Sequence, residues 1–467
     1  SDFLPSQACI ESKLTKNISL KTPLISAAMD TVTESKMAIS LAEAGGIGII
    51  HKNNSISDQA ALVKSVKKYE SGIVRDPVTI GSNKSIGELR QLTSELSISG
   101  MPVVDSGKLQ GIVTSRDFRY AENMNAKVSS IMTPFEKLVT VEEGFSQEDV
   151  MKLMYKNRIE KILVLDGDNN LSGLVTMKDI EKSAQHPNAT KDSSGRLQVG
   201  AAIGTGEDTL DRAEALAEAG VDVFVIDSAH GHSLNVINTI KVIKDKFKDI
   251  DVIGGNIATA DAATELVKAG ADAVKVGMGP GSICTTRIIA GIGVPQISAI
   301  LEIKKALDGK DINIIADGGI RFSGDIAKAI AAGADSVMLG SLFAGTEEAP
   351  GKVELFQGRS FKTYRGMGSI GAMTERDDAN RYLQEDVEND KLVPEGIEGR
   401  VPYKGLVINV INQLVGGVRQ SMGYIGCKNI EDMQNNSQFV EITNAGMAES
   451  HVHDVMITKE APNYQRS

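Results

Sequence analysis

Residues 260–279, ADAATELVKAGADAVKVGMG, contain a helix, a strand and a glycine-rich loop in direct succession. Apolar residues recur at helical spacing in ADAATELVKAG (260–270), and its final glycine is a helix C-cap signal. DAVKVGMG (272–279) is short, rich in valine and ends in glycine, which is typical of a strand buried on both faces of a parallel sheet. The stretch therefore predicts one repeat of an α/β fold.

The same unit recurs along the chain. The other predicted strands are PLISAAMD (23–30), GGIGIIH (45–51), LQVGAAIG (197–204), VDVFVIDS (221–228), DVIGGNIA (251–258), INIIADGG (312–319) and DSVMLGSLFAG (335–345). The other predicted helices are TESKMAISLAEAG (33–45), TLDRAEALAEAG (209–220) and FSGDIAKAIAAGA (322–334). Eight strands that alternate with helices predict a (β/α)₈ barrel, and an open doubly wound sheet is the alternative.

The composition narrows the class of protein. The 467 residues suffice for two or three domains, and none of the apolar runs approaches the ~20 residues of a membrane span. Three scattered cysteines and the lack of a signal peptide favour a reducing cytoplasm. The net charge of -11 argues against a nucleic-acid or anionic membrane surface. The chain starts Ser-Asp-Phe, so we expect it to be truncated or processed.

A separate domain is predicted between the second and third strands, where an internal repeat lies. LQGIVTSRDF (109–118) matches LSGLVTMKDI (171–180), and MPVVD (101–105) parallels ILVLD (162–166). Each copy indicates two strands and then a helix that opens with Thr-x-x-Asp. We expect the barrel to comprise residues 1–73 and 185–467, with residues 74–184 inserted as one paired domain.

The two copies resemble tandem CBS modules. In such modules the Thr and Asp often contact the ribose of an adenine or guanine nucleotide, so the resemblance implies ATP or GTP binding here. The matching residues are Thr114, Asp117, Thr176 and Asp179. The same residue types are also good helix caps without any ligand, and both interpretations stay open.

The region from Thr363 to Gly405 is long, polar and without helical or strand periodicity. Long loops inside compact domains are usually functional or disordered. We expect this region to be irregular and to form a mobile lid over the mouth of the barrel.

A cysteine lies in the loop VGMGPGSICTTR (276–287), at the carboxyl end of the sixth strand, where barrel active sites are found. Gly277, Gly279 and Gly281 allow the backbone to bend and approach a ligand closely. Clustered carbonyl groups would bind a hard cation, and clustered N–H groups an anion. Cys284 is therefore a candidate nucleophile, and the alternative is a small buried apolar residue.

The loops after the last two strands predict a phosphate site, as is common in these barrels. Backbone N–H groups and a hydroxyl would come from Gly318, Gly319, Gly340 and Ser341, whereas the acceptor Asp317 suits a sugar diol. Further polar candidates at strand ends are Asp227 and Ser228, which could bind a ribose, and Asn256. His230 and His232 lack partners for a zinc site and are read as exposed loop residues.

Taken together, these segments resemble the inosine-5′-monophosphate (IMP) dehydrogenase family over essentially the whole chain. The matching segments are SAAMDTVTE, GGIGIIHKN, the tandem CBS insertion, DSAHGHS, GGNIAT, VGMGPGSICTTR, IADGGI, YRGMGS, RYLQ, LVPEGIEGRVPYKG and ESHVHDVMITKEAPNY. The resemblance implies that IMP, NAD⁺ and water give XMP and NADH, the committed step of guanine nucleotide synthesis. Cys284 would attack C2 of the purine, and the resulting covalent thioimidate would be hydrolysed after the lid closes.

The resemblance also implies a role for each matching residue. IMP contacts match Met29, Ser282, Asp317, Gly318, Gly319, Gly340, Ser341, Tyr364, Gly366, Met367, Gly368 and Glu395. The NAD site matches Asp227, Ser228, Asn256, Gly277 and Gly279. A potassium site matches the carbonyls of Gly279, Gly281 and Cys284, completed by Glu449, Ser450 and His451 of a neighbouring subunit, which implies a homotetramer. One departure is Lys275, which stands where some relatives carry arginine.

Water activation is implied for Arg381 and Tyr382 on the lid, with Thr286 assisting. An arginine is effectively always protonated in proteins, so a relay from Thr286 to Glu395 is the chemically easier alternative. Two other functions compete with IMP oxidation. GMP reductase shares the barrel and the cysteine loop but typically lacks the CBS insertion and the Arg-Tyr lid. The other is a CBS nucleotide sensor whose barrel has lost activity, and the intact cysteine, phosphate loops and lid argue against it.

Overall fold

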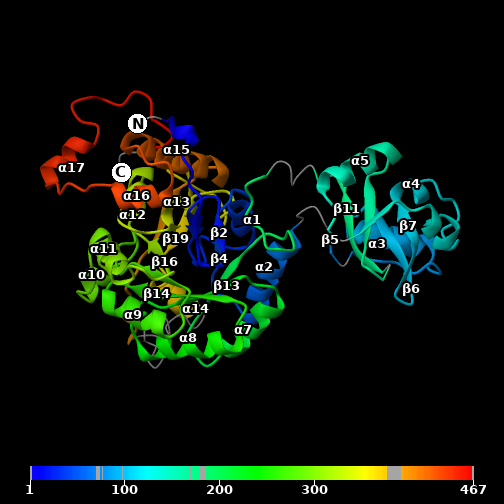
Figure 1. Ribbon diagram of the computed structural model, residues 1–467, viewed down its shortest axis with the longest axis horizontal. Coiled ribbons are helices and arrows are strands. Elements are labelled where there is room, and N and C mark those ends of the chain that lie inside the picture. The colour runs from blue at the N-terminus through cyan, green and yellow to red at the C-terminus, as the bar shows by residue number, and fades with distance from the viewer. Residues whose placement is uncertain are drawn as a thin grey trace. The chain divides into compact units, whose positions relative to one another are not determined.

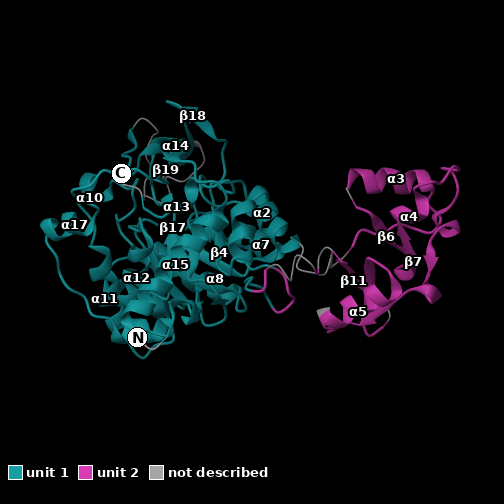
Figure 2. Cartoon of the chain, turned by 90° about the horizontal axis from the view of Figure 1, so that it is seen from above, with its two compact units in different colours: residues 1–69, 188–192, 197–467 teal, residues 70–187, 193–196 magenta. Residues whose placement is uncertain are grey.

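The computed structural model describes residues 3–69, 74–75, 77–96, 98–142, 144–168, 170–177, 180, 186–375 and 391–464. The chain divides into two compact units. Unit 1 comprises residues 1–69, 188–192 and 197–467, and unit 2 comprises residues 70–187 and 193–196 (Figure 2).

Unit 1 is built around a closed parallel barrel in the order β12-β13-β14-β15-β16-β17-β3-β4. Its strands are β3 (Leu24–Ser26), β4 (Ile47–Ile50), β12 (Gly200–Ile203), β13 (Val223–Asp227), β14 (Asp251–Ile257), β15 (Ala273–Val276), β16 (Asn313–Asp317) and β17 (Ser336–Leu339). Each lies inside one of the eight predicted runs, so the predicted (β/α)₈ barrel is confirmed and the open sheet is excluded.

Helices surround the barrel (Figure 1). They are α1 (Ser35–Glu43), α2 (Ile56–Lys68), α7 (Thr209–Glu218), α8 (Leu234–Lys246), α9 (Ala260–Lys268), α10 (Thr286–Ile289), α11 (Gln296–Ala306), α12 (Ser323–Ala331), α13 (Ser341–Ala344), α15 (Val407–Ile425) and α16 (Ile430–Asn436). Helix α17 (Asn444–Ser450) follows them on a projecting segment. Helix α15 packs against α12 and α1 and completes the ring after the last strand. The amino-terminal segment contributes η1 (Pro5–Gln7) and the antiparallel pair β1 (Ser12–Lys13) and β2 (Ser19–Leu20).

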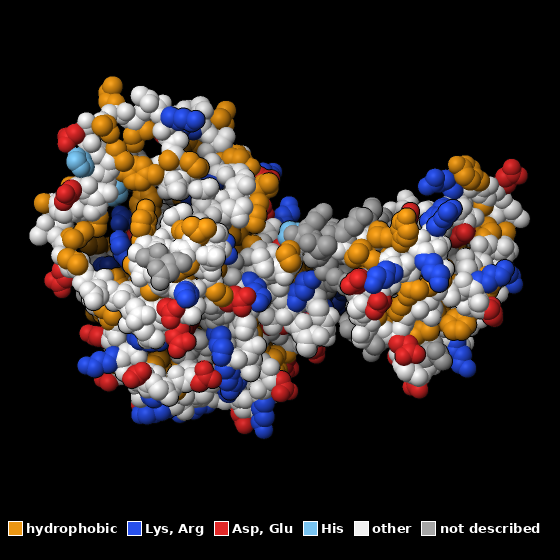
Figure 3. Space-filling model, turned by 45° about the horizontal axis from the view of Figure 1, so that its top comes forward, with side chains coloured by type: hydrophobic (Ala, Val, Ile, Leu, Met, Phe, Trp, Pro, Cys, Tyr) orange, Lys and Arg blue, Asp and Glu red, His pale blue; other side chains and the backbone are white. Residues whose placement is uncertain are grey.

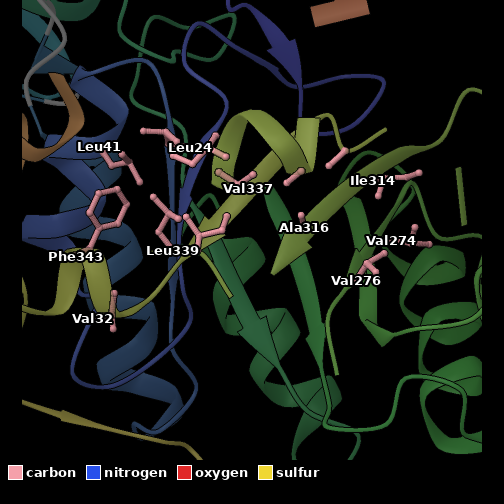
Figure 4. Close-up of a cluster of buried hydrophobic side chains, with 14 of the residues drawn as sticks. Leu24, Val32, Leu41, Val274, Val276, Ile314, Ala316, Val337, Leu339 and Phe343 are labelled. Atoms are coloured by element: carbon pink, nitrogen blue, oxygen red, sulfur yellow. The ribbon is translucent and has the colours of Figure 1, made fainter. Parts of the chain in front are cut away.

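Strand alternation divides the core of unit 1 into two layers. Val274 and Val276 lie in the large cluster between strands and helices, together with Ile314 and Ala316 (Figure 4). Ala273, Ile315, Val223 and Val225 instead belong to the cluster inside the barrel. Because side chains alternate along a strand, the residues next along at the carboxyl ends, such as Lys275, also face inward. The interior therefore changes from apolar to charged towards the carboxyl end of the barrel.

The predicted lid was expected to be irregular, and this is wrong at both of its ends. Strands β18 (Glu354–Phe356), β19 (Arg359–Arg365) and β20 (Glu398–Pro402) form an antiparallel sheet, and α14 (Ile370–Glu375) follows β19. The sequence of β19 shows no alternation of apolar and polar residues, because one of its buried positions holds a lysine. This residue, Lys362, donates to the carbonyls of Thr346 and Ala349. Residues 376–390, in the middle of the region, lie outside the described residues.

Unit 2 contains two small sheets, in the orders β6-β7-β8 and β5-β11-β10-β9. Its elements are β5 (Val74–Arg75), α3 (Ile86–Glu95), β6 (Gly100–Asp105), β7 (Lys108–Thr114), α4 (Ser115–Phe118), η2 (Val128–Ser130), β8 (Thr133–Pro134), η3 (Phe135–Lys137), β9 (Thr140–Glu142), α5 (Gln147–Asn157), β10 (Lys161–Leu165) and β11 (Leu171–Thr176). The pairs β6–β7 and β10–β11 are the two strand pairs that the internal repeat predicts. Leu109 and Ile112 of the first copy pack with Leu163 and Leu165 of the second, which joins the copies.

Charged side chains of both signs are interspersed on the face of the molecule shown in Figure 3, without one continuous basic patch. Separately, none of the helices in the described ranges combines the length and the apolar character needed to cross a bilayer.

Candidate active site

A cavity of about 500 Å³ lies at the carboxyl ends of the barrel strands. Loops after β3, β13, β15, β16 and β17 contribute to its lining, together with Asn256 of β14, the end of β19 and the segment before β20. Its volume is within the range of small-molecule sites, about 300–1,000 Å³. The cavity therefore occupies the position at which barrel enzymes bind their substrates.

The loop that carries the cysteine is held by backbone contacts. A Cβ on Gly277 would lie 2.0 Å from the carbonyl oxygen of Asp317, so only glycine permits this approach. Gln296 donates from Nε2 to the carbonyl oxygens of Val276 (2.8 Å) and Asp317 (3.3 Å). Arg287 donates to the carbonyls of Met278 (3.3 Å) and Val294 (2.7 Å). These contacts fix where the loop leaves β15.

Cys284 lines the cavity and is partly exposed, with its Sγ donating to Oγ1 of Thr286 over 3.2 Å. The residues before β20 run alongside this loop in an antiparallel bridge between Cys284 and Gly396. The N–H of Thr285 donates to the carbonyl of Glu395 over 2.9 Å. The thiol is thus held at the cavity surface by two segments far apart in the sequence.

The loops after β16 and β17 approach the cavity through glycines. Gly318 and Gly319 have φ values of +88° and +79°, which side-chain-bearing residues rarely adopt. A Cβ on Gly340 would lie 2.7 Å from the hydroxyl of Tyr364. Burial raises the pKa of Tyr364 above its ordinary value, so its hydroxyl remains neutral and can donate a hydrogen bond.

Polar side chains form the floor of the cavity. Asn256 donates from Nδ2 to the carbonyl of Gly277 and to Oδ2 of Asp317, both over 2.9 Å. Lys275, which is 1% exposed, donates to Asp317 and Asp227 from below. An amide and a carboxylate are therefore held in place at the base of the site.

The cavity brings together most of the predicted site residues. Those that line it are Met29, Ser228, Asn256, Gly277, Gly279, Gly281, Ser282, Cys284, Thr286, Asp317, Gly318, Gly319, Gly340, Ser341, Tyr364, Gly366, Met367 and Glu395. Gln296 and Arg287 also line it and were not predicted to do so. Gln296 is the first residue of α11, and its position there gives no sign of a role in the cavity. Its partners are backbone carbonyls that are distant in the sequence.

Several predicted residues lie elsewhere. Asp227 is 2% exposed and is absent from the lining, because its carboxylate faces Lys275 beneath the cavity. Gly368 lies behind the lining and accepts from the N–H of Glu395. Arg381 and Tyr382 fall outside the described residues.

The three carboxyl-terminal residues predicted for a cation site are not part of this chain's own cavity. Glu449 and Ser450 end α17, and His451 contacts Tyr464 through Nδ1 over 3.0 Å. Their contribution to a site on another copy stays a prediction. His230 and His232 are exposed, and the described residues contain no cluster of three His, Cys, Asp or Glu side chains suited to a metal.

A family model described as the IMP dehydrogenase / GMP reductase domain matches residues 1–453. The chain belongs to this family. It is 55% identical to an inosine-5′-monophosphate dehydrogenase of Pasteurella multocida over 100% of this chain and 96% of the relative. It is 56% identical to that of Aquifex aeolicus over 99% of this chain and 95% of the relative.

One similar solved structure is a cysteine-to-alanine variant of a GMP reductase from Trypanosoma brucei in complex with guanosine 5′-monophosphate. It is 41% identical, with a TM-score of 0.86 over 97% of this chain and 95% of that chain. A match over 97% of the chain must include unit 2. The match to this GMP reductase therefore extends over the inserted unit, so that unit by itself does not separate the two activities.

Proposed function

We propose that the protein oxidises IMP to XMP with NAD⁺ and water, releasing NADH. The observation that carries this proposal is a partly exposed thiol, Cys284, in a cavity lined by the glycine loops after β16 and β17. The dehydrogenase relatives, at about 55% identity over the full chain, favour this reaction over GMP reduction at 41%.

The proposed chemistry starts at the thiol. Cys284 attacks C2 of the purine, and a hydride passes from C2 to the nicotinamide of NAD⁺, which leaves a thioimidate on the enzyme. The 5′-phosphate is bound by N–H groups of Gly319 and Gly340 and the hydroxyl of Ser341, while Asp317 accepts from the ribose. Asn256 and Ser228 line the part of the cavity assigned to the nicotinamide end.

Hydrolysis of the thioimidate returns the thiol and releases XMP. Thr286 and Glu395 both line the cavity beside Cys284, which supports a relay between them as a route for the proton of the attacking water. Arg381 and Tyr382 remain the alternative pair on sequence grounds. A permanently protonated arginine must lose its proton to act as a base, whereas a carboxylate need not.

The purified protein is expected to form NADH, followed at 340 nm, when it is given IMP and NAD⁺. GMP with NADPH serves as the control, because a GMP reductase would consume NADPH instead. Failure to form NADH while NADPH is consumed would assign the protein to the reductase. If neither pair reacts but ATP or GTP binds, the nucleotide-sensor reading takes its place.

Arg381→Ala is expected to preserve a rapid first turnover of NADH and to slow the steady state by about 10²–10⁴-fold. This is the range of a lost general acid–base group, and it follows if Arg381 acts only in hydrolysis. Rapid mixing of enzyme with IMP and NAD⁺ measures the burst. A variant without a burst would place Arg381 in the hydride-transfer step instead.

A potassium ion and a homotetramer are part of the proposal. Main-chain carbonyls of Gly279, Gly281 and Cys284 are the hard oxygen donors that such a cation prefers. The segment that includes α17 projects from the rest of unit 1 in Figure 1, and Val440 (84%), Val455 (67%) and Met456 (91%) are exposed on it. Apolar residues exposed in this way favour contact with a second copy.

Nucleotide binding by unit 2 also remains a proposal, as does the assignment of residues 74–184 to tandem CBS modules. Thr114 donates from its N–H and its hydroxyl to Oδ2 of Asp117 over 2.7 and 2.8 Å, which is a capping box. ATP or GTP would have to compete with this contact. Asp179 of the second copy lies outside the described residues. A cytoplasmic location is proposed from the three free cysteines.

A further inference from the structure

Three charged residues face the inside of the barrel at its carboxyl end. Asp227 ends β13, Lys275 lies one residue before the end of β15, and Asp317 ends β16. Ala273 lies two positions before Lys275 on β15, and Ile315 lies two positions before Asp317 on β16. Both belong to the interior cluster. Because side chains alternate along a strand, the charged residues extend this interior layer upwards to the base of the cavity.

Lys275 connects these residues. Its Nζ donates to Oδ1 of Asp227 and to Oδ2 of Asp317, both over 3.0 Å, and also contacts Oδ1 of Asn256. The lysine and Asp227 side chains are each 2% exposed, whereas the Asp317 side chain is 19% exposed. One buried cation therefore joins a carboxylate below the cavity to a carboxylate on its surface.

Gly255 makes room for this contact. It pairs with Asp227 on one side and with Lys275 on the other, so it lies between them in the sheet. A Cβ at Gly255 would lie 2.7 Å from Cβ of Lys275 and 2.8 Å from its carbonyl oxygen. The lysine can reach across β14 to Asp227 because the intervening residue has no side chain.

The charges explain what the lysine does for Asp317. Two carboxylates that share a site repel each other, and a cation between them offsets that repulsion. Within the described ranges, Lys275 is the cation that contacts both carboxylates, and Asp317 is the more exposed of the two. Both donors to Asp317, Lys275 and Asn256, bind its Oδ2, and within the described ranges no donor reaches Oδ1. That oxygen remains available to a ligand.

We propose that Lys275 is a positioning residue, which compensates the charge of Asp227 and holds the Asp317 carboxylate in place, with Oδ1 free to accept from a ribose hydroxyl of the substrate. The proposal rests on the proposed function, because it takes a ribonucleotide as the ligand. It assigns the lysine no contact with the substrate.

The test compares binding of IMP with binding of its 2′-deoxy and 3′-deoxy analogues, measured by calorimetry without turnover. The wild type is expected to bind IMP at least about tenfold more tightly than one of the analogues, as for a lost hydrogen bond to a charged group. Lys275→Met is expected to abolish that preference. Adding Asp227→Asn to it restores the net charge of the cluster, so the double variant is expected to recover most of the preference.

Lys67→Met is the matched control. Lys67 is also buried between two aspartates, with Nζ 3.0 Å from Asp192 and 2.8 Å from Asp222. Asp222 precedes β13, whereas Asp227 ends it, so this cluster lies at the opposite end of the same strand. The control is expected to lower the melting temperature and to leave the preference for IMP unchanged.

The outcomes separate the two proposals. A wild type that binds IMP normally but forms no NADH overturns the proposed function alone. A Lys275→Met variant that keeps the preference, or a double variant no better than the single one, overturns the role of Lys275. If Lys275→Met does not fold, recovery of a cooperative melting transition in the double variant supports charge compensation, and an unfolded double variant refutes it. A wild type that does not bind IMP overturns both.

Discussion

Replacing Cys284 with alanine is expected to reduce NADH formation from IMP and NAD⁺ by at least ~10³-fold, as when a covalent nucleophile is lost. The thiol is the group that forms the bond to C2, and the neighbouring Thr286 hydroxyl is a much weaker nucleophile at neutral pH. Absorbance at 340 nm measures the rate. Mass spectrometry of the quenched enzyme is expected to show a nucleotide adduct only when Cys284 is present.

Binding of IMP to this variant is expected to persist, because the glycine loops and Asp317 are unchanged. Cys9→Ala is the control, since Cys9 is exposed and lies outside the cavity lining. Its activity is expected to match that of the wild type. Normal NADH formation by Cys284→Ala would exclude the covalent mechanism, and loss of IMP binding would show that the thiol also shapes the pocket.

Gly277→Ala is expected to lower kcat/KM by about 100-fold, the effect of displacing reacting groups by about 1 Å. The new Cβ would lie 2.0 Å from the carbonyl oxygen of Asp317, and neither backbone can yield without moving the cysteine loop or the end of β16. Both segments line the cavity, so thiol and ribose acceptor would shift relative to each other. Steady-state kinetics with IMP and NAD⁺ measure the loss.

Gly204→Ala provides the comparison, because Gly204 also follows a barrel strand, β12, but a Cβ there meets only the Lys52 side chain at 3.5 Å or more. We expect its kcat/KM to stay within about threefold of the wild type, as for surface substitutions. Equal losses in the two variants would show that any alanine at these strand ends is harmful. No loss in Gly277→Ala would show that the loop tolerates displacement.

The barrel strands were predictable because the residues of each strand match the apolar surroundings on its two faces. The run VDVFVIDS is apolar on both faces, since β13 packs against helices on one side and the barrel interior on the other. The glycines and Cys284 of the β15 loop were predictable for a related reason, because parallel strands all end at one mouth. The hydrophobic periodicity of a segment and the positions of its glycines are local properties of the sequence, so they do not change when the segment folds into a closed barrel.

Other features were not predictable because they depend on partners distant in the sequence. Lys362 and Tyr364 make β19 look polar, yet both are buried, the lysine against backbone carbonyls. Asp227 resembled a cavity residue from its place at a strand end, and the structure turns its carboxylate onto Lys275. No local sequence pattern predicts such contacts, because each joins residues that are distant along the chain.

The amino-acid sequence by itself determined the barrel, the inserted unit and the loops that meet at one end, because hydrophobic period and glycine position are set residue by residue. Only the tertiary structure decided which charged side chains face the ligand and which support it from beneath. The roles of these side chains depend on Gly255, which has no side chain of its own. This absence lets the buried Lys275 reach across β14 and contact two carboxylates.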